Sequence, residues 1–123
     1  MHCPTHAYAD VVVAAATGRI DFAGAQALEA ALAPALEPGS AIRGVVVDLS
    51  RVDYISSVGL RVLMLAAKQS KSQGGAIAVV ALQPVVKEIF EISKFTLVIP
   101  CFTGVRDALA ELSPSALAAY GAA

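Results

Sequence analysis

Charged residues are scarce in this chain, and tryptophan is absent from it. Only 15% of the 123 residues are charged, and 9 lysines and arginines against 10 aspartates and glutamates leave a net charge of -1. A nucleic-acid-binding domain normally shows a strongly basic face or an excess of positive charge. We therefore expect no nucleic-acid partner.

Long hydrophobic runs are also missing, although 57% of the residues are hydrophobic. The longest uncharged stretch, residues 72–86, contains two glycines and a proline and is shorter than the roughly 20 apolar residues that a spanning helix needs. The N-terminus shows no basic region followed by an apolar run, as a secretory signal would. Cys3 and Cys101 form neither a C-x-x-C motif nor a disulfide framework. These features predict a soluble, reduced, cytoplasmic protein without membrane insertion.

Signals of catalysis are few. The sequence has no G-x-x-x-x-G-K-[ST] loop for phosphates. Its only histidines, His2 and His6, lie with Cys3 at the N-terminus, where we expect a frayed arm rather than a catalytic or metal site. Cys101 is predicted to be a small buried hydrophobic residue. We expect no catalytic residue, no metal and no cofactor, and hence not an enzyme.

The order of predicted elements indicates one α/β domain of residues 8–112, preceded by an arm of residues 1–7. Strands are predicted around Tyr8 and at residues 11–17, 44–49, 76–80 and 96–99, and helices at residues 22–37, 57–72, 84–92 and 103–112. The pattern predicts an α/β sandwich with a mixed, mostly parallel sheet of four or five strands, about four helices and an antiparallel N-terminal strand pair. The tail, residues 113–123, is either loosely held or one short helix.

Local residues add detail to the first and last helices. Asp21 is placed to cap the first helix, and Pro34 is expected to kink its last turn or end it early. Thr103 is expected to cap the last helix, which follows a short strand ending at Pro100.

The segment from Asp48 to Leu60 follows a buried strand and opens a helix. Ser57 is expected at the first helical residue, where unpaired amides and the helix dipole favour an anion. A simpler interpretation is that Ser56 or Ser57 only caps the helix. Gly59, in the first turn, costs about 1 kcal/mol relative to alanine, which close approach by a partner or a phosphate would explain.

The second helix also offers a candidate contact surface. Met64 falls among Arg61, Lys68 and Lys71 on the stripe that we expect to face outward, and a methionine beside charges suits a contact with another protein. The other stripe is apolar and is made of Val58, Val62 and Leu65, followed by Gln69.

These segments resemble the STAS family, the domain of bacterial anti-sigma factor antagonists. The family pattern of a buried strand followed by D-x-S and then S-x-G-[L/V] is similar to Asp48-Leu49-Ser50 and Ser57-Val58-Gly59-Leu60. The stretch from Thr17 to Asp21 resembles the family's T-G-x-[L/I]-D, and residues 84–95 resemble its P-x-V-x-x-x-[F/L] segment.

The resemblance implies a partner switch. In such antagonists the serine at the position of Ser57 is phosphorylated by the anti-sigma factor, a kinase of the GHKL class. The unphosphorylated antagonist binds that kinase and frees the sigma factor, and a PP2C-type phosphatase reverses the modification. Many members carry Asp where this chain has Ser56, which leaves Ser56 as a second, less favoured acceptor.

The expected partner-binding surface surrounds this serine. We expect Asp21 and Asp53 near the same loop, so that phosphorylation makes the face strongly negative and blocks docking without remodelling the fold. The residues expected to take part in partner binding are Asp21, Asp53, Ser56, Ser57, Gly59, Arg61, Met64 and Lys68.

Other functions stay open at this point. Within the family, the chain could be a regulatory subunit of a transporter, such as a lipid-transporting ABC complex, or a stressosome-type scaffold. Outside that role, it could be a small enzyme or a nucleotide-binding protein that uses the same loop. As a partner switch we expect a monomer or a weak dimer.

Overall fold

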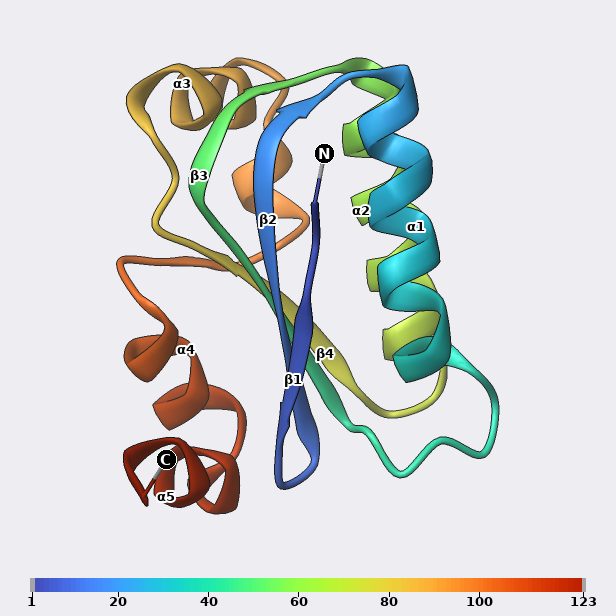
Figure 1. Cartoon of the computed structure of the whole chain (residues 1–123), viewed down its shortest axis with the longest axis vertical. Coiled ribbons are helices and arrows are strands. Elements are labelled where there is room, and N and C mark those ends of the chain that lie inside the picture. Colours follow the sequence, from blue (N-terminus) through green and yellow to red (C-terminus); the bar gives the residue numbers. More distant parts are fainter. Residues whose placement is uncertain (1, 123) are drawn as a thin grey trace.

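A computed structural model describes residues 2–122, which form a five-stranded sheet with the strand order β1-β2-β3-β4-β5 (Figure 1). The strands are β1 (Thr5–Tyr8), β2 (Val11–Ile20), β3 (Gly44–Ile55), β4 (Ala76–Val80) and β5 (Cys101–Phe102). β1 pairs with β2 in antiparallel fashion, and every later pair is parallel. The predicted mixed sheet and its antiparallel N-terminal pair are confirmed.

Helices cover both faces of the sheet. They are α1 (Phe22–Leu36), α2 (Ser57–Ser72), α3 (Pro84–Ile92), α4 (Val105–Leu112) and α5 (Pro114–Ala122), with a short 3₁₀ helix η1 (Phe95–Leu97). In Figure 1, α1 and α2 lie together against one face, and α4 and α5 lie together on the other side of the sheet. Pro34 lies inside α1, which ends soon after it at Leu36.

The two faces of the sheet explain the continuous apolar runs in its strands. Val45, Val47 and Leu49 of β3 belong to the core under α1, α2 and α3, whereas Val46 between them belongs to the core under α4 and α5. Side chains alternate between the faces of a strand, and both faces are covered, so consecutive positions must all be apolar.

Two strands are longer than predicted. β2 runs past Gly18 to Ile20, and β3 runs past Leu49 to Ile55, with register shifts between the two strands on the way. Shifts of this kind, as at a β-bulge, let the two strands stay paired beyond the point where the apolar pattern ends. The extension carries β3 directly up to the predicted serine site.

The predicted strand at residues 96–99 is wrong. Lys94 adopts a left-handed conformation with φ 60°, η1 follows, and the pairing strand is β5. Leu97 and Val98 are 82% and 50% exposed, so this apolar run is not a buried strand. Cys101 is exposed rather than buried, because its short strand pairs on one side only, with β4. The cap residue of α4 is Gly104, while the Thr103 hydroxyl donates to Asp107.

Both ends of the described chain pack on the sheet. His2 pairs with Thr17, so the N-terminal arm continues along β2 instead of fraying. The tail forms the short helix α5, where the Ser113 hydroxyl donates to Asp10 at 2.7 Å and Tyr120 packs edge-on against Tyr8. Within residues 2–122, no helix combines the length and apolar character that crossing a membrane requires.

Candidate functional site

The predicted serine site lies where β3 passes into α2. Ser56 has an extended backbone, and its hydroxyl oxygen accepts a hydrogen bond from the Gly59 amide at 3.2 Å. Its own amide donates to the Ile20 carbonyl at 2.8 Å. Ser56 is therefore the N-cap, half-buried and tied to both β2 and α2, whereas Ser57 is the first helical residue and is exposed.

Helix α1 begins at the same edge of the sheet and in the same way. The Asp21 carboxylate accepts from the Gly24 amide at 2.9 Å, as Ser56 does from Gly59. Ile20 and Ile55 are paired in the parallel register of β2 and β3, so the caps that follow them are neighbours. Two helix N-termini, each the positive end of a dipole, thus meet beside Ser57.

Gly59 is needed for packing inside the protein. A Cβ at this position would lie 2.6 Å from Cγ2 of Ile20 and 2.8 Å from Cγ1 of Ile55, both buried. The first turn of α2 rests directly on the ends of β2 and β3. The expectation that a partner or a phosphate explains this glycine is therefore wrong, because the neighbouring strands already require it.

The charges near Ser57 are of both signs. Asp21 and Asp53 are exposed, as expected for a surface around the serine. The sequence interpretation did not include Arg19, which pairs with Tyr54 across β2 and β3 and places its guanidinium 4.4 Å from the centre of that ring. Arg61 is also exposed, in the second turn of α2. The unmodified surface is mixed in charge rather than acidic.

The two stripes of α2 lie differently from the prediction. Its buried residues are Gly59, Leu63, Ala66 and Ser70. Met64, expected to be exposed, is half-buried and packs against the core, while Arg61 and Lys68 are exposed as expected. Val58 and Leu65, on the stripe expected to face the core, are 38% and 44% exposed. The side of α2 that faces the core is therefore not the predicted one. Val58 and Leu65 lie at the edge of the contact between α1 and α2.

An apolar groove results between α1 and α2. It begins beside Phe22, which is 67% exposed, and Val58, the residue after Ser57. A cavity of about 200 Å³ there is also lined by Gln26, Arg61 and Leu65, and a second of about 240 Å³ continues along both helices to Pro38. We call this surface the α1–α2 groove. The sequence pattern did not single out Phe22, since an aromatic residue in a first turn is usually assigned to the core.

The D-x-S residues of the motif are structural. The Asp48 carboxylate accepts from the Ser50 amide at 2.9 Å, and the Gln83 side chain donates to the Ser50 carbonyl at 2.8 Å. This short network holds the middle of β3 to the residue that precedes α3. It fixes the path of the chain toward the serine site without contributing groups to that site.

Comparisons with known proteins agree with this geometry. A family model described as the STAS domain matches residues 3–108. BtrV of Bordetella bronchiseptica, which carries a provisional name as an anti-sigma factor antagonist, is 44% identical over 90 residues, a match that covers 73% of this chain and 76% of that protein.

Solved structures give the same result. An anti-sigma factor antagonist from Mycobacterium paratuberculosis matches with a TM-score of 0.77 and 27% identity, covering 90% of this chain and 92% of that one. SpoIIAA, at 14% identity, matches in its unphosphorylated form with a TM-score of 0.77 over 89% and 95% of the two chains. The phosphorylated form of Bacillus SpoIIAA matches with a TM-score of 0.70 over 89% and 98%, also at 14% identity. At this identity the match to SpoIIAA shows a shared fold.

Substituting Gly59→Ala should lower the free energy of unfolding by about 1–3 kcal/mol, because the added methyl overpacks the contact with Ile20 and Ile55. Gly121→Ala in α5 is the control, since the nearest atom to its added Cβ is 4.0 Å away. The free energy of unfolding of this control should be unchanged or should rise by up to about 1 kcal/mol, because alanine has the higher helix propensity. Urea unfolding measures both, and a Gly59→Ala protein as stable as the parent would contradict the packing.

Proposed function

The chain belongs to the STAS domain family, and we propose that it is an anti-sigma factor antagonist that acts as a phosphorylation-controlled partner switch. In its unphosphorylated form it binds an anti-sigma factor that is a kinase of the GHKL class. A phosphate on Ser57 ends that binding, and a PP2C-type phosphatase restores it. The exposed position of Ser57 at the start of α2 is the observation that carries this proposal. The role is one of regulated binding rather than catalysis.

Ser57 is favoured over Ser56 as the phosphate acceptor. The Ser56 hydroxyl is engaged with the Gly59 amide, and its residue is half-buried. Phosphorylating it would remove the N-cap and strain the packed first turn. Ser57 is exposed, and its modification leaves that hydrogen bond in place.

The fold is suited to carry a phosphate at this position. A phosphate adds about -1.5 to -2 charges at pH 7, and an anion near a helix N-terminus is stabilised by about 0.3–2 kcal/mol. Arg19 and Arg61 add positive charge to the same region. SpoIIAA, whose fold this chain shares, has been solved in both phosphorylated and unphosphorylated forms. We therefore propose that the modification changes the surface and leaves the fold intact.

The proposed docking surface combines Ser57 with the α1–α2 groove. Phe22 and Val58 bring exposed apolar area next to the serine, and Arg61 adds a charge at the rim. A partner that covers this area would have to bury the Ser57 side chain as well. A doubly charged phosphate in such a contact would cost desolvation and meet the nearby Asp21 and Asp53.

The other residues predicted at this surface have different roles in partner binding. Lys68 and Arg61 are exposed on α2 and are available to a partner. Gly59 lets α2 pack on the strands, and Met64 packs against the core, so both act through the position of α2. Ser56 contributes as the cap that holds Ser57 outward.

Incubation with a GHKL anti-sigma kinase and ATP should place one phosphate on Ser57. Ser57→Ala should abolish incorporation of phosphate. Ser56→Ala should still be phosphorylated, but its free energy of unfolding should fall by about 1 kcal/mol because the helix cap is lost. Intact-mass and peptide mass spectrometry measure the stoichiometry and the position. Incorporation that survives in Ser57→Ala and disappears in Ser56→Ala would move the acceptor to Ser56.

Affinity for that kinase should depend on charge at Ser57. Ser57→Ala should bind within about twofold of the parent, because it removes one exposed hydroxyl. Ser57→Asp should bind at least about tenfold more weakly, since a carboxylate brings part of the charge of a phosphate. Isothermal titration calorimetry measures both constants, and equal affinities for the two variants would refute the switch.

Loss of apolar area in the groove should also weaken the complex. Phe22→Ser should lower the affinity by about tenfold or more, as expected for an aromatic residue at the centre of an interface. Leu97→Ser is the matched control, because Leu97 is 82% exposed but lies in η1, outside the groove. If Leu97→Ser costs as much affinity as Phe22→Ser, the groove is not the docking surface.

A further inference from the structure

The connections of the sheet change direction at its β4–β5 edge. The chain leaves β2, β3 and β4 to enter α1, α2 and α3, which share one core represented by Leu28, Leu63 and Phe90. After β5 it enters α4, whose Leu109 lies in the core on the opposite face. Helices on opposite faces of the sheet thus flank the crevice at the carboxyl ends of β4 and β5. Beside Ser57, by contrast, α1 and α2 lie on the same face.

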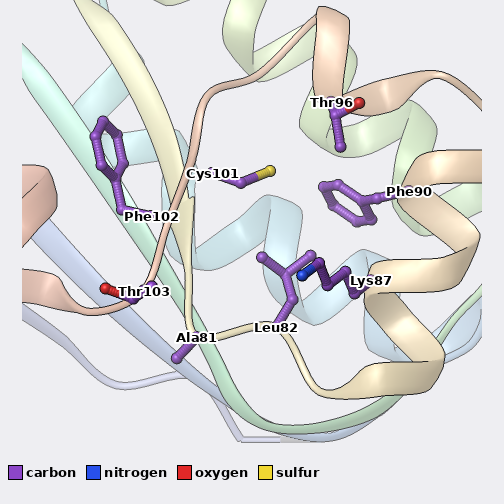
Figure 2. Close-up of a pocket in the computed structure, with 8 residues that line it drawn as sticks. All are labelled: Ala81, Leu82, Lys87, Phe90, Thr96, Cys101, Phe102 and Thr103. Atoms are coloured by element: carbon purple, nitrogen blue, oxygen red, sulfur yellow. The ribbon is translucent and has the colours of Figure 1, made fainter.

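A cavity of about 320 Å³ occupies this crevice, within the range of small-molecule pockets (Figure 2). Its walls come from the segment after β4, from α3 and η1, and from β5 with the residue after it. Its lining residues include Leu82, Lys87, Phe90, Thr96 and Cys101. We call this cavity the β4–β5 pocket.

The pocket combines an apolar wall with one cation. Leu82 is half-buried and offers apolar surface beside the buried Phe90, whereas the Phe102 ring lies on the other side of β5 and packs with the core under α4 and α5. Lys87 is the one charged residue in the lining of this pocket. In Figure 2 the Lys87 amine from α3 and the Cys101 sulfur from β5 point into the same space beside the Phe90 ring. Partial burial of its sulfur raises the pKa of the otherwise exposed Cys101, and the charge of Lys87 acts against that rise.

The backbone at the mouth of the pocket is held in an unfavourable conformation. Ala81, directly after β4, has φ 58°, in the left-handed region that alanine rarely adopts. Its amide donates to the Phe102 carbonyl at 3.0 Å, which ties the ends of β4 and β5 together. Strained residues of this kind gather where a fold shapes a binding site.

We propose that the β4–β5 pocket binds a small amphiphilic carboxylate, with its apolar part against Leu82 in the space beside Phe90 and Cys101, and its carboxylate beside Lys87. The lysine provides the charge-assisted contact with the carboxylate. The proposal is independent of phosphorylation at Ser57, since the pocket is formed by other elements. The pocket thus gives the protein a binding site for a small molecule, separate from the site of phosphorylation.

Protection of Cys101 from alkylation tests the proposal. In a Cys3→Ser background Cys101 is the only thiol, and its rate of reaction with N-ethylmaleimide reports access to the pocket. Octanoate should slow that rate saturably, and octanol should do so with an affinity about tenfold lower, because it lacks the charge. Lys87→Gln should abolish the preference for octanoate, whereas Lys68→Gln on α2 should leave it unchanged.

Backbone NMR of the parent protein with octanoate provides the second measurement. The largest amide shifts should fall on Leu82, Thr96 and Thr103, which line the pocket. Absence of saturable protection, a preference that survives in Lys87→Gln, or shifts centred on the α1–α2 groove would each overturn the proposal. No partner protein or kinase enters either measurement, so its failure is distinguishable from failure of the partner switch.

Discussion

The contact of the first turn of α2 with the ends of β2 and β3 is the constraint on which the site depends. Gly59 leaves no space above Ile20 and Ile55, and the Ser56 hydroxyl caps the turn from below. With Ser56 and Gly59 both held in place, the two residues between them, Ser57 and Val58, are exposed. Ser57 therefore points outward at the positive end of a helix.

The same edge of the sheet carries two sites of different chemistry. At β2 and β3 both connecting helices lie on one face, so their N-termini form a surface with an apolar groove between them. At the ends of β4 and β5 the helices that follow lie on opposite faces, and a pocket lined by Leu82 and Lys87 opens there. The exposed surface around Ser57 suits a protein partner, and the β4–β5 pocket suits a small molecule. The two proposed kinds of binding therefore use different strands of the sheet.

The sequence predicted the elements whose signals are local. The bounds of α2 and α3 and the cap at Asp21 follow from neighbouring residues, and they were right. The prediction of a strand at residues 96–99 was wrong because an apolar run has the same pattern whether it is buried or exposed. The change in chain direction comes from the left-handed conformation of Lys94, which the pattern does not show. The roles of Gly59 and Met64 depend on contacts with Ile20 and with the core, which are distant in sequence. The position of Phe22 beside Val58 depends in the same way on how α1 lies along α2.

Comparison of the amide NMR spectra of the phosphorylated and unphosphorylated proteins tests most directly whether the charge acts at the surface alone. We expect shifts at Ser57 and its neighbours, at the first turn of α1 and along the near end of the α1–α2 groove. Amides of the central strand β4, residues 76–80, should stay unchanged. Shifts of similar size throughout β4 and the buried side of α2 would mean that the phosphate remodels the domain, and would contradict the account.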